Sequence, residues 1–398
     1  MRKSKRMLRR ARLGLGPSSI AVLVGAAILG TAGQAGGAWS LVPSPNSPGR
    51  RSVLNAVAVV APDDVWAVGV GTPPDSGTLQ TLTEHWDGVS WTVVPSPNRL
   101  GRDARNALTG VTAIASNDVW AVGYSTDLDS PTVYSTLTIH WDGDNWSIVA
   151  SPNLEPAPNA YNALLGVSAV ATDDIWAVGG APVADAGRAI FMHWDGAAWS
   201  LFPAPLEMRF WPNSSRFSVL AIASDNAWSV GAGESAHWDG VSWTVVPGAQ
   251  DDWTIAAANP TAVWAVGAFS TYDEGQYFGP FTKAARWDGS QWFNTRSLSP
   301  RWDDTFVGVT VISPEDVWAV GRTGLSTLTE HWDGAVWSVV PSPDANPNPQ
   351  PRRRDQNQLL AAAQVSSDDV WAVGYFYESD GFTQRTLILH WEGLATGP

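Results

Sequence analysis

Histidine and aspartate are the residues of this chain whose types and spacing could support acid–base catalysis or metal binding. All six histidines directly precede a repeated W-[DE]-G segment, and an arginine takes that place in one further copy: His85, His140, His193, His237, Arg286, His331 and His390. Imidazole is a common metal ligand and titrates near neutral pH. However, equivalent positions of a repeat stand around a ring and cannot converge within the roughly 2 Å reach of a metal ion. We therefore interpret the histidines as structural.

The aspartates are repetitive as well. The Asp of each W-D-G segment, and pairs such as Asp63 with Asp64 or Asp173 with Asp174, would suit paired catalytic carboxylates or calcium ligands. Their recurrence at tight turns instead favours a role in accepting hydrogen bonds from the backbone. The sequence contains no cysteine, which excludes disulfides and thiolate chemistry. We predict no catalytic residue, no metal site and no cofactor.

The elements that position these residues are marked by three recurring tryptophans. A [VIA]-W-[AS]-V-G segment has its tryptophan at Trp66, Trp120, Trp176, Trp228, Trp264, Trp318 and Trp371. The W-[DE]-G segment has its tryptophan at Trp86, Trp141, Trp194, Trp238, Trp287, Trp332 and Trp391. In six copies a third follows five positions later, at Trp91, Trp146, Trp199, Trp243, Trp292 and Trp337. The short β-branched and aromatic runs between Asp, Gly and Pro turns predict four strands in each unit.

The seventh copy ends without its third tryptophan, and the missing segment lies at the other end of the chain. Residues 39–46 read WSLVPSPN and match residues 91–98, WTVVPSPN, position for position. A closed ring uses such an N-terminal strand to complete its last unit, whereas a linear solenoid has no need of one. The sequence therefore predicts an all-β, seven-bladed β-propeller with four antiparallel strands per blade, closed by residues 39–46.

The repeat resembles a known family. Residues 64–69, DVWAVG, and residues 85–91, HWDGVSW, are similar to a kelch-type repeat, as in galactose-oxidase-like propellers, and the resemblance covers residues 39–398. Residues 87–91, DGVSW, are also similar to the Asp-box of sialidase propellers. These resemblances imply the fold and no activity, because propellers host unrelated functions. A galactose-oxidase site needs a Cys-linked Tyr, and a sialidase site needs three converging arginines, a trio that the sequence does not assign.

Residues 1–38 are predicted to be an export segment, because seven basic residues precede a short apolar run at 20–30. That run is shorter than the roughly 20 residues that span a bilayer, so no stable membrane span is expected after cleavage. The predicted propeller domain, residues 39–398, holds 17 basic against 38 acidic residues, and this net charge of −21 disfavours nucleic acid as a partner. We expect a secreted, extracellular monomer, either free or associated with the cell surface.

Two of the four connections in each unit vary in length. From the second-strand tryptophan to the third-strand tryptophan there are 10 to 23 positions, and the connections between units vary similarly. In a four-stranded meander both variable connections emerge at the same end of the ring, here called the variable face; the other end is the constant face. Function is expected on the variable face, because scaffolds carry binding sites on variable loops.

Three tryptophans lie outside the repeat, in connections that enter the fourth, fifth and sixth units: Trp211, Trp253 and Trp302. The fifth unit adds Tyr272, Tyr277 and Phe278. These six residues are the predicted ligand-binding site, because aromatic side chains stack sugar rings or anchor protein partners; alternatively, they only cover loop ends. The sequence thus favours a secreted, non-catalytic binding module for a glycan or an extracellular protein. A glycan-active hydrolase or lyase on the same face is the alternative, and a scaffold that docks other subunits is a third.

Overall fold

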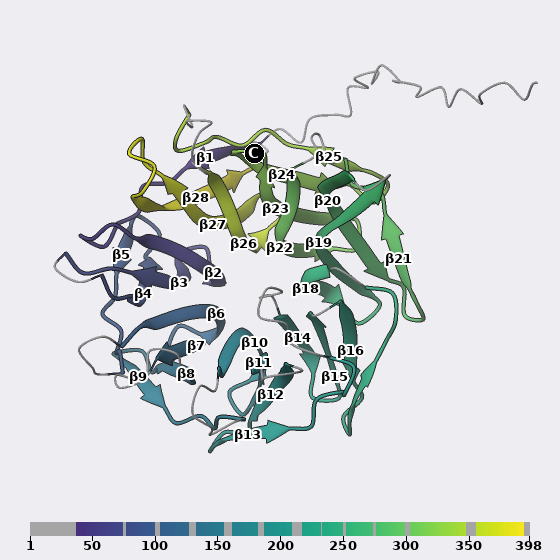
Figure 1. Cartoon of the computed structure of the whole chain (residues 1–398), viewed down its shortest axis with the longest axis horizontal. Helices are drawn as coiled ribbons and strands as arrows, with labels where there is room; N and C mark the ends of the chain where they lie inside the picture. The colour runs from purple at the N-terminus through teal and green to yellow at the C-terminus, as the bar shows by residue number, and fades with distance from the viewer. Residues whose placement is uncertain are drawn as a thin grey trace, which may run out of the picture. The chain divides into compact units, whose positions relative to one another are not determined.

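The computed structural model describes residues 37–74, 77–99, 104–126, 133–154, 161–181, 187–208, 217–231, 233–249, 252–273, 276–298, 303–347 and 356–393. Within these ranges the regular elements are 28 β-strands, which form seven four-stranded sheets arranged as a ring (Figure 1). The predicted all-β, seven-bladed propeller is therefore confirmed. No helix in the described part of the chain has the length and apolar character needed to cross a bilayer.

The first four blades follow one another along the chain. Blade 1 contains β2 (Ser52–Ala61), β3 (Asp64–Gly71), β4 (Gln80–Trp86) and β5 (Trp91–Val93). Blade 2 contains β6 (Asn106–Ala115), β7 (Asp118–Thr126), β8 (Tyr134–Trp141) and β9 (Trp146–Val149). Blade 3 contains β10 (Ala163–Ala171), β11 (Asp174–Ala181), β12 (Arg188–Trp194) and β13 (Trp199–Phe202). Blade 4 contains β14 (Phe217–Ala223), β15 (Asn226–Gly231), β16 (Glu234–Trp238) and β17 (Trp243–Val245).

The remaining blades complete the ring, and the last of them uses both ends of the described chain. Blade 5 contains β18 (Asp252–Asn259), β19 (Ala262–Asp273), β20 (Gln276–Trp287) and β21 (Trp292–Thr295). Blade 6 contains β22 (Asp304–Ser313), β23 (Asp316–Thr323), β24 (Ser326–Trp332) and β25 (Trp337–Val339). Blade 7 contains β26 (Asn357–Ser366), β27 (Asp369–Tyr377), β28 (Gln384–Glu392) and, as its outer strand, β1 (Ala38–Leu41).

Each blade is an antiparallel meander whose first strand lies nearest the centre of the ring (Figure 1). This order places the start of the first strand, the end of the second and the start of the third at the variable face. On β3, Trp66 and Val68 pack against blade 2, whereas Ala67 packs against blade 7. Alternation along a strand sends successive side chains to opposite faces, so large and small residues interlock between neighbouring sheets as the sequence indicates.

Tryptophan rings fill the space between the outer parts of neighbouring blades. The Trp66 ring meets Trp141 and Trp146 of the next blade at centroid distances of 5.0 and 5.3 Å, the second of them edge to face. Such edge-to-face pairs add to the stabilisation from burying large rings. Trp39 and Trp318 repeat the edge-to-face contact at 5.2 Å across blades 7 and 6. The closing strand therefore contributes the same packing as the other outer strands.

Ring closure depends on β1 and on the S-P-N segment that follows it. Trp39 lies opposite Trp391 in the antiparallel pairing of β1 with β28. The Asn46 Oδ1 accepts a hydrogen bond from the Thr386 N–H at 2.9 Å. The same bond joins Thr81 to Asn98, Thr136 to Asn153 and Thr327 to Asp344. In these four blades the segment thus ties the end of the outer strand to the third strand, and the predicted closure by residues 39–46 is confirmed.

The glycine that ends the W-A-V-G segment is required by close backbone packing. A Cβ atom on Gly69 would lie 1.9 Å from the carbonyl oxygen of Val53 on the neighbouring first strand. This approach is far inside van der Waals contact, so a larger side chain would push the first strand away from the second.

Candidate functional site

The histidines and their carboxylate partners lie at the constant face and have structural contacts. In five blades the His Nε2 lies 2.8–2.9 Å from an Asp carboxylate of the same blade: His85–Asp64, His140–Asp118, His193–Asp174, His331–Asp316 and His390–Asp369. Asn226 replaces the aspartate beside His237, and burial lowers the pKa of that imidazole. In blade 5, Arg286 lies over the Trp264 ring at 5.9 Å. One pair per blade cannot form a shared site.

The aspartates of the W-D-G segments cap turns, as the sequence indicates. The Asp87 Oδ1 accepts hydrogen bonds from the N–H groups of Val89 and Ser90 at 2.9 and 2.8 Å. These two bonds lower the pKa of Asp87, since they favour the ionised carboxylate. The same turn recurs at Asp142, Asp195, Asp239, Asp288 and Asp333. Within the described ranges, no group of three or more His, Asp or Glu side chains could hold a metal ion.

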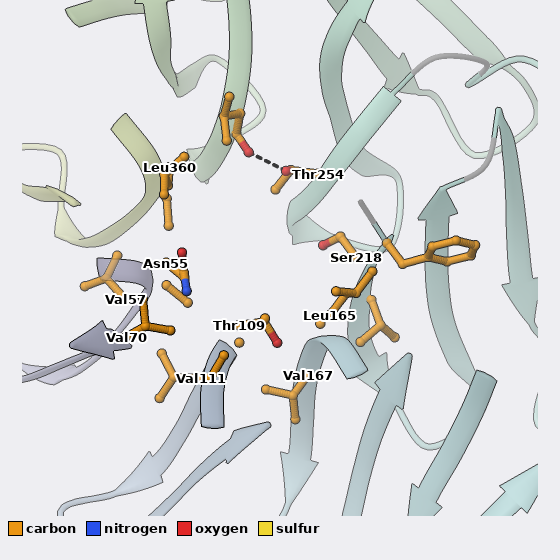
Figure 2. A pocket seen from close by; sticks show the side chains of 18 of the residues that line it. Asn55, Val57, Val70, Thr109, Val111, Leu165, Val167, Ser218, Thr254 and Leu360 are labelled. Carbon is orange, nitrogen blue, oxygen red and sulfur yellow. Dashed lines mark hydrogen bonds between the residues drawn. The ribbon is translucent and has the colours of Figure 1, made fainter. Parts of the chain in front are cut away.

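The variable face contains a cavity of about 460 Å³ at the centre of the ring. First strands of all seven blades line it, and most side chains on its wall are aliphatic, such as Val57, Val111 and Leu360 (Figure 2). Its polar side chains largely join blades to one another. Thr109 donates to the Leu164 carbonyl oxygen at 2.7 Å, and the Asn55 amide makes the same kind of bond to the next blade. Most side chains on the cavity wall are thus aliphatic, and its polar side chains form hydrogen bonds that connect neighbouring blades.

A second cavity of about 800 Å³ lies at the variable face where blades 7, 1 and 2 meet. Four arginines line it: Arg50, Arg51, Arg105 and Arg385. It shares the lining residues Arg51 and Leu79 with the central cavity, so the two cavities adjoin each other, and together we call them the recess. We call these four arginines and the cavity that they line the arginine pocket.

The backbone holds two of these arginines in equivalent positions. The Arg51 N–H donates to the Thr72 Oγ1 at 3.0 Å, and its carbonyl accepts from the Thr72 N–H at 2.9 Å. Arg105 makes the same pair of bonds with Thr126, at 2.9 and 2.8 Å. Both side chains are exposed. Each arginine therefore projects from a fixed point at the start of its blade.

A row of tyrosines adjoins the arginine pocket. The Tyr134 ring lies 5.2 Å from the Tyr124 ring and 4.1 Å from the Tyr161 ring. Burial raises the pKa of Tyr161 to about 12, and the two neighbouring tyrosines add to the shift. Burial and Tyr134 also raise the pKa of Tyr124, while Arg51 and Arg105 oppose that shift. The raised pKa values keep Tyr124 and Tyr161 neutral, so these two phenols carry no charge that would cancel the arginines.

Sequence reasoning missed this recess. The sequence assigns no group of arginines to a site, whereas Arg50, Arg51, Arg105 and Arg385 line one cavity in the structure. One signal was available, because Arg51 precedes Trp66 by the same spacing as Arg105 precedes Trp120. A second was Tyr124, which directly follows the W-A-V-G segment of its unit.

The predicted aromatic site is only partly described. Trp211 and Trp302 lie outside the described residues. Trp253 lies on β18, and Tyr272 pairs with Tyr277 across β19 and β20, but only the backbone of these three is described. Phe278, also on β20, is half-buried opposite Thr271. Whether these six residues form one site stays a prediction.

Blade 5 also has a cavity of about 590 Å³ beside the exposed Phe269 and Leu298. Phe269 and Phe281 pack with ring centroids 5.6 Å apart at its edge. This places two further aromatic residues in the blade for which the sequence predicts aromatic ligand contacts.

Comparisons with known proteins support the fold alone. No family model matches the chain, and no curated protein sequence matches it. Among solved structures, "YCF48 bound to D1 peptide" is 14% identical with a TM-score of 0.51, over 89% of this chain and 96% of that chain. The WD40 propeller domain of Doa1 is 11% identical with a TM-score of 0.51, over 90% and 98%. The polysaccharide lyase Uly1 is 8% identical with a TM-score of 0.50, over 89% and 92%.

These neighbours place the chain in the class of β-propeller proteins. One of these neighbours is bound to a peptide and another is a polysaccharide lyase, and one fold hosting several functions is common. The kelch-like character of the repeat stays a prediction.

Proposed function

We propose that the protein is an exported, non-catalytic binding module that holds a glycan or a segment of an extracellular protein at its variable face. The observation that carries the proposal is the pair of adjoining cavities at the variable face, the central cavity and the arginine pocket, which are about 460 and 800 Å³ in volume. Cavities of this size are in the range of ligand sites. The solved neighbours add that proteins of this fold include one bound to a peptide.

The chemistry of the constant face supports binding over catalysis. Each His–Asp pair is confined to one blade, and its imidazole packs on a tryptophan ring of that blade, as His390 does on Trp371 with centroids 4.0 Å apart. A catalytic centre requires acid, base and nucleophile within hydrogen-bond reach of one substrate. The six histidines of this chain are instead distributed singly over six of the seven blades.

The proposal is tested by screening the purified protein against a glycan array and a library of short random peptides. Hydrogen–deuterium exchange with the best ligand should then show protection around Arg51, Arg105 and Tyr124. Protection confined to the constant-face turns, such as residues 87–90, would contradict the proposed face.

The predicted aromatic site is tested on the same ligand. If Trp211, Trp253 and Trp302 contribute, their joint replacement by alanine should weaken retention and leave the thermal unfolding midpoint unchanged. Unchanged retention would remove these residues from the site.

The alternative function, a glycan-active hydrolase or lyase, requires an activity assay. Incubation with cell-wall and plant polysaccharides should release no new reducing ends if the protein only binds. Sustained release that is lost when the recess is altered would favour the enzyme.

A further inference from the structure

The arginine pocket concentrates positive charge on a protein that is otherwise acidic. Beyond residue 38 the chain has 17 basic and 38 acidic residues, yet four arginines line this one cavity. Side chains of like charge repel one another, so such a cluster costs stability unless something compensates for it. The cluster therefore requires an explanation from function or from local pairing.

Local pairing accounts for only part of the cluster. The Arg385 Nε lies 2.7 Å from the Glu378 Oε1, and its Nη1 donates to the Gly49 carbonyl at 3.0 Å. Arg50 lies close enough to Asp380 to help lower the pKa of that carboxyl, which is about 2 mainly because of hydrogen bonds from Thr383. These two arginines are thus matched by carboxylates.

Arg51 and Arg105 differ from Arg50 and Arg385 in their lack of a described carboxylate partner. Neither has a carboxylate partner among the residues that the structure describes, and both side chains are exposed beside the recess. Their backbones are fixed by the paired bonds to Thr72 and Thr126. A guanidinium presents a fork of donors that matches a carboxylate bidentately. Two guanidinium groups on fixed backbones, with no carboxylate partner in the described ranges, form a candidate carboxylate site.

The surroundings of these two arginines favour a peptide over an acidic glycan. Val70 and Ala107 are nearly fully buried in an apolar cluster beside the central cavity, and the half-buried Leu79 and Tyr124 pack against this cluster and line the same cavity. An aliphatic or aromatic side chain fits such a surface, whereas a sugar needs a free aromatic face. The described tyrosine rings of the row instead pack against one another at tilted angles, with the Tyr134 and Tyr161 ring centroids 4.1 Å apart.

The negative charge of the rest of the propeller also favours a peptide over an acidic glycan. A polyanion such as a uronic acid polymer would carry charge beyond the pocket and meet the acidic body of the propeller. Repulsion over distances within about 8–10 Å is only partly screened at physiological salt. A ligand with one or two localised carboxylates avoids this repulsion.

We propose that the arginine pocket binds a carboxylate of a peptide segment, through Arg51 and Arg105, while a neighbouring apolar side chain of that peptide enters the mouth of the central cavity. This inference rests on the proposed binding function and specifies its ligand class. It also assigns recognition to blades 1 and 2 rather than to the aromatic sector of blades 4 to 6.

The test uses the full chain and a library of short random peptides, prepared once with free C-terminal carboxylates and once as C-terminal amides. The variant is Arg51→Gln with Arg105→Gln. The matched control is Arg188→Gln with Arg296→Gln, which removes the same charge from two exposed arginines outside the pocket. Retained peptides are sequenced, and their affinities are measured by fluorescence anisotropy at low and high salt.

We expect enrichment of peptides with Asp, Glu or a free C-terminal carboxylate beside an apolar residue. Hydrogen bonds to charged groups are strong enough that each arginine should account for about a tenfold loss of affinity. The double pocket variant should therefore bind about a hundredfold more weakly, while the control variant keeps its affinity. The unfolding midpoint of both variants should match that of the wild type, since all four side chains are exposed.

Three outcomes would overturn the inference. Peptides that bind equally well to the pocket variant would show that the variable face binds ligands by other residues, and would leave the broader proposal standing. Acidic oligosaccharides that bind through Arg51 and Arg105, with no peptide enriched, would exclude the peptide. If neither peptides nor glycans bind, the proposed function fails as well.

Discussion

Replacing Glu330 by glutamine should stabilise the protein at alkaline pH relative to the wild type and have a smaller effect in acid. The Glu330 side chain is fully buried on the side of blade 6 that faces blade 5. Its Oε2 accepts a hydrogen bond from the Leu298 N–H at 3.2 Å, and its Oε1 has no partner in the described part of the chain. The pKa of Glu330 is raised to about 7, mainly by burial; the hydrogen bond from Leu298 opposes the shift and the nearby Asp304 adds to it.

The pKa difference determines the size of the effect. An unfolded glutamate has a pKa of 4.5, whereas the folded protein keeps Glu330 protonated up to about pH 7. The stability contributed by the protonated carboxyl is therefore fully present below pH 4.5 and is lost as the pH rises to about 7. Each pH unit in this window changes the free energy of unfolding by about 1.4 kcal/mol. The wild type should lose about 3 kcal/mol through this group, and Glu330→Gln should not.

Urea unfolding monitored by tryptophan fluorescence provides the assay, at pH 4 and at pH 8.5. The difference in free energy of unfolding between variant and wild type should change by about 3 kcal/mol between the two pH values. Glu315→Gln, which alters an exposed carboxylate, is the control and should show little change. If the pH profiles of Glu330→Gln and wild type run parallel, Glu330 does not titrate with a raised pKa and the reasoning is refuted.

Three further substitutions test the packing of the ring. Trp39→Ala removes a buried ring from the closing strand and should lower the free energy of unfolding by about 3–5 kcal/mol in urea. Gly123→Ala places a Cβ 1.9 Å from the Ala107 carbonyl oxygen and should lower the thermal midpoint, whereas Gly77→Ala, with open space around it, should not. Glu84→Gln should flatten the loss of stability with rising pH, because burial raises the Glu84 pKa; an unchanged profile would contradict this.

The fold could be predicted because its constraints recur at fixed spacing. The repeat places counterparts of Trp66, of the W-D-G turn at Asp87 and of Trp91 at the same spacing, so seven copies of the pattern define seven sheets. Closure was also predictable, because residues 39–46 repeat a segment that the last unit lacks. The contacts show why that segment is needed: Asn46 bonds to Thr386 just as Asn98 bonds to Thr81.

The recess could not be predicted in the same way. Arg51 and Arg105 lie in connections whose lengths differ from blade to blade, and their approach depends on how blades 1 and 2 sit side by side in the closed ring. Arg385 joins them only because blade 7 closes against blade 1. A repeat pattern reports what the blades share, whereas this recess is built from residues in which they differ.

Two buried glutamates, Glu330 and Glu84, show that a residue difference between blades also changes hydrogen bonding within the core. Glu330 and Glu84 occupy equivalent positions on the third strands of blades 6 and 1, but only Glu330 has a donor, the Leu298 N–H of blade 5. Glu84 faces blade 7, where Pro45 takes the place of Leu298 after the outer-strand tryptophan. Proline has no amide hydrogen, and both Glu84 oxygens are without partners among the described residues. The junction between blades 7 and 1 therefore contains a buried carboxyl with no described partner, which makes this junction sensitive to rising pH.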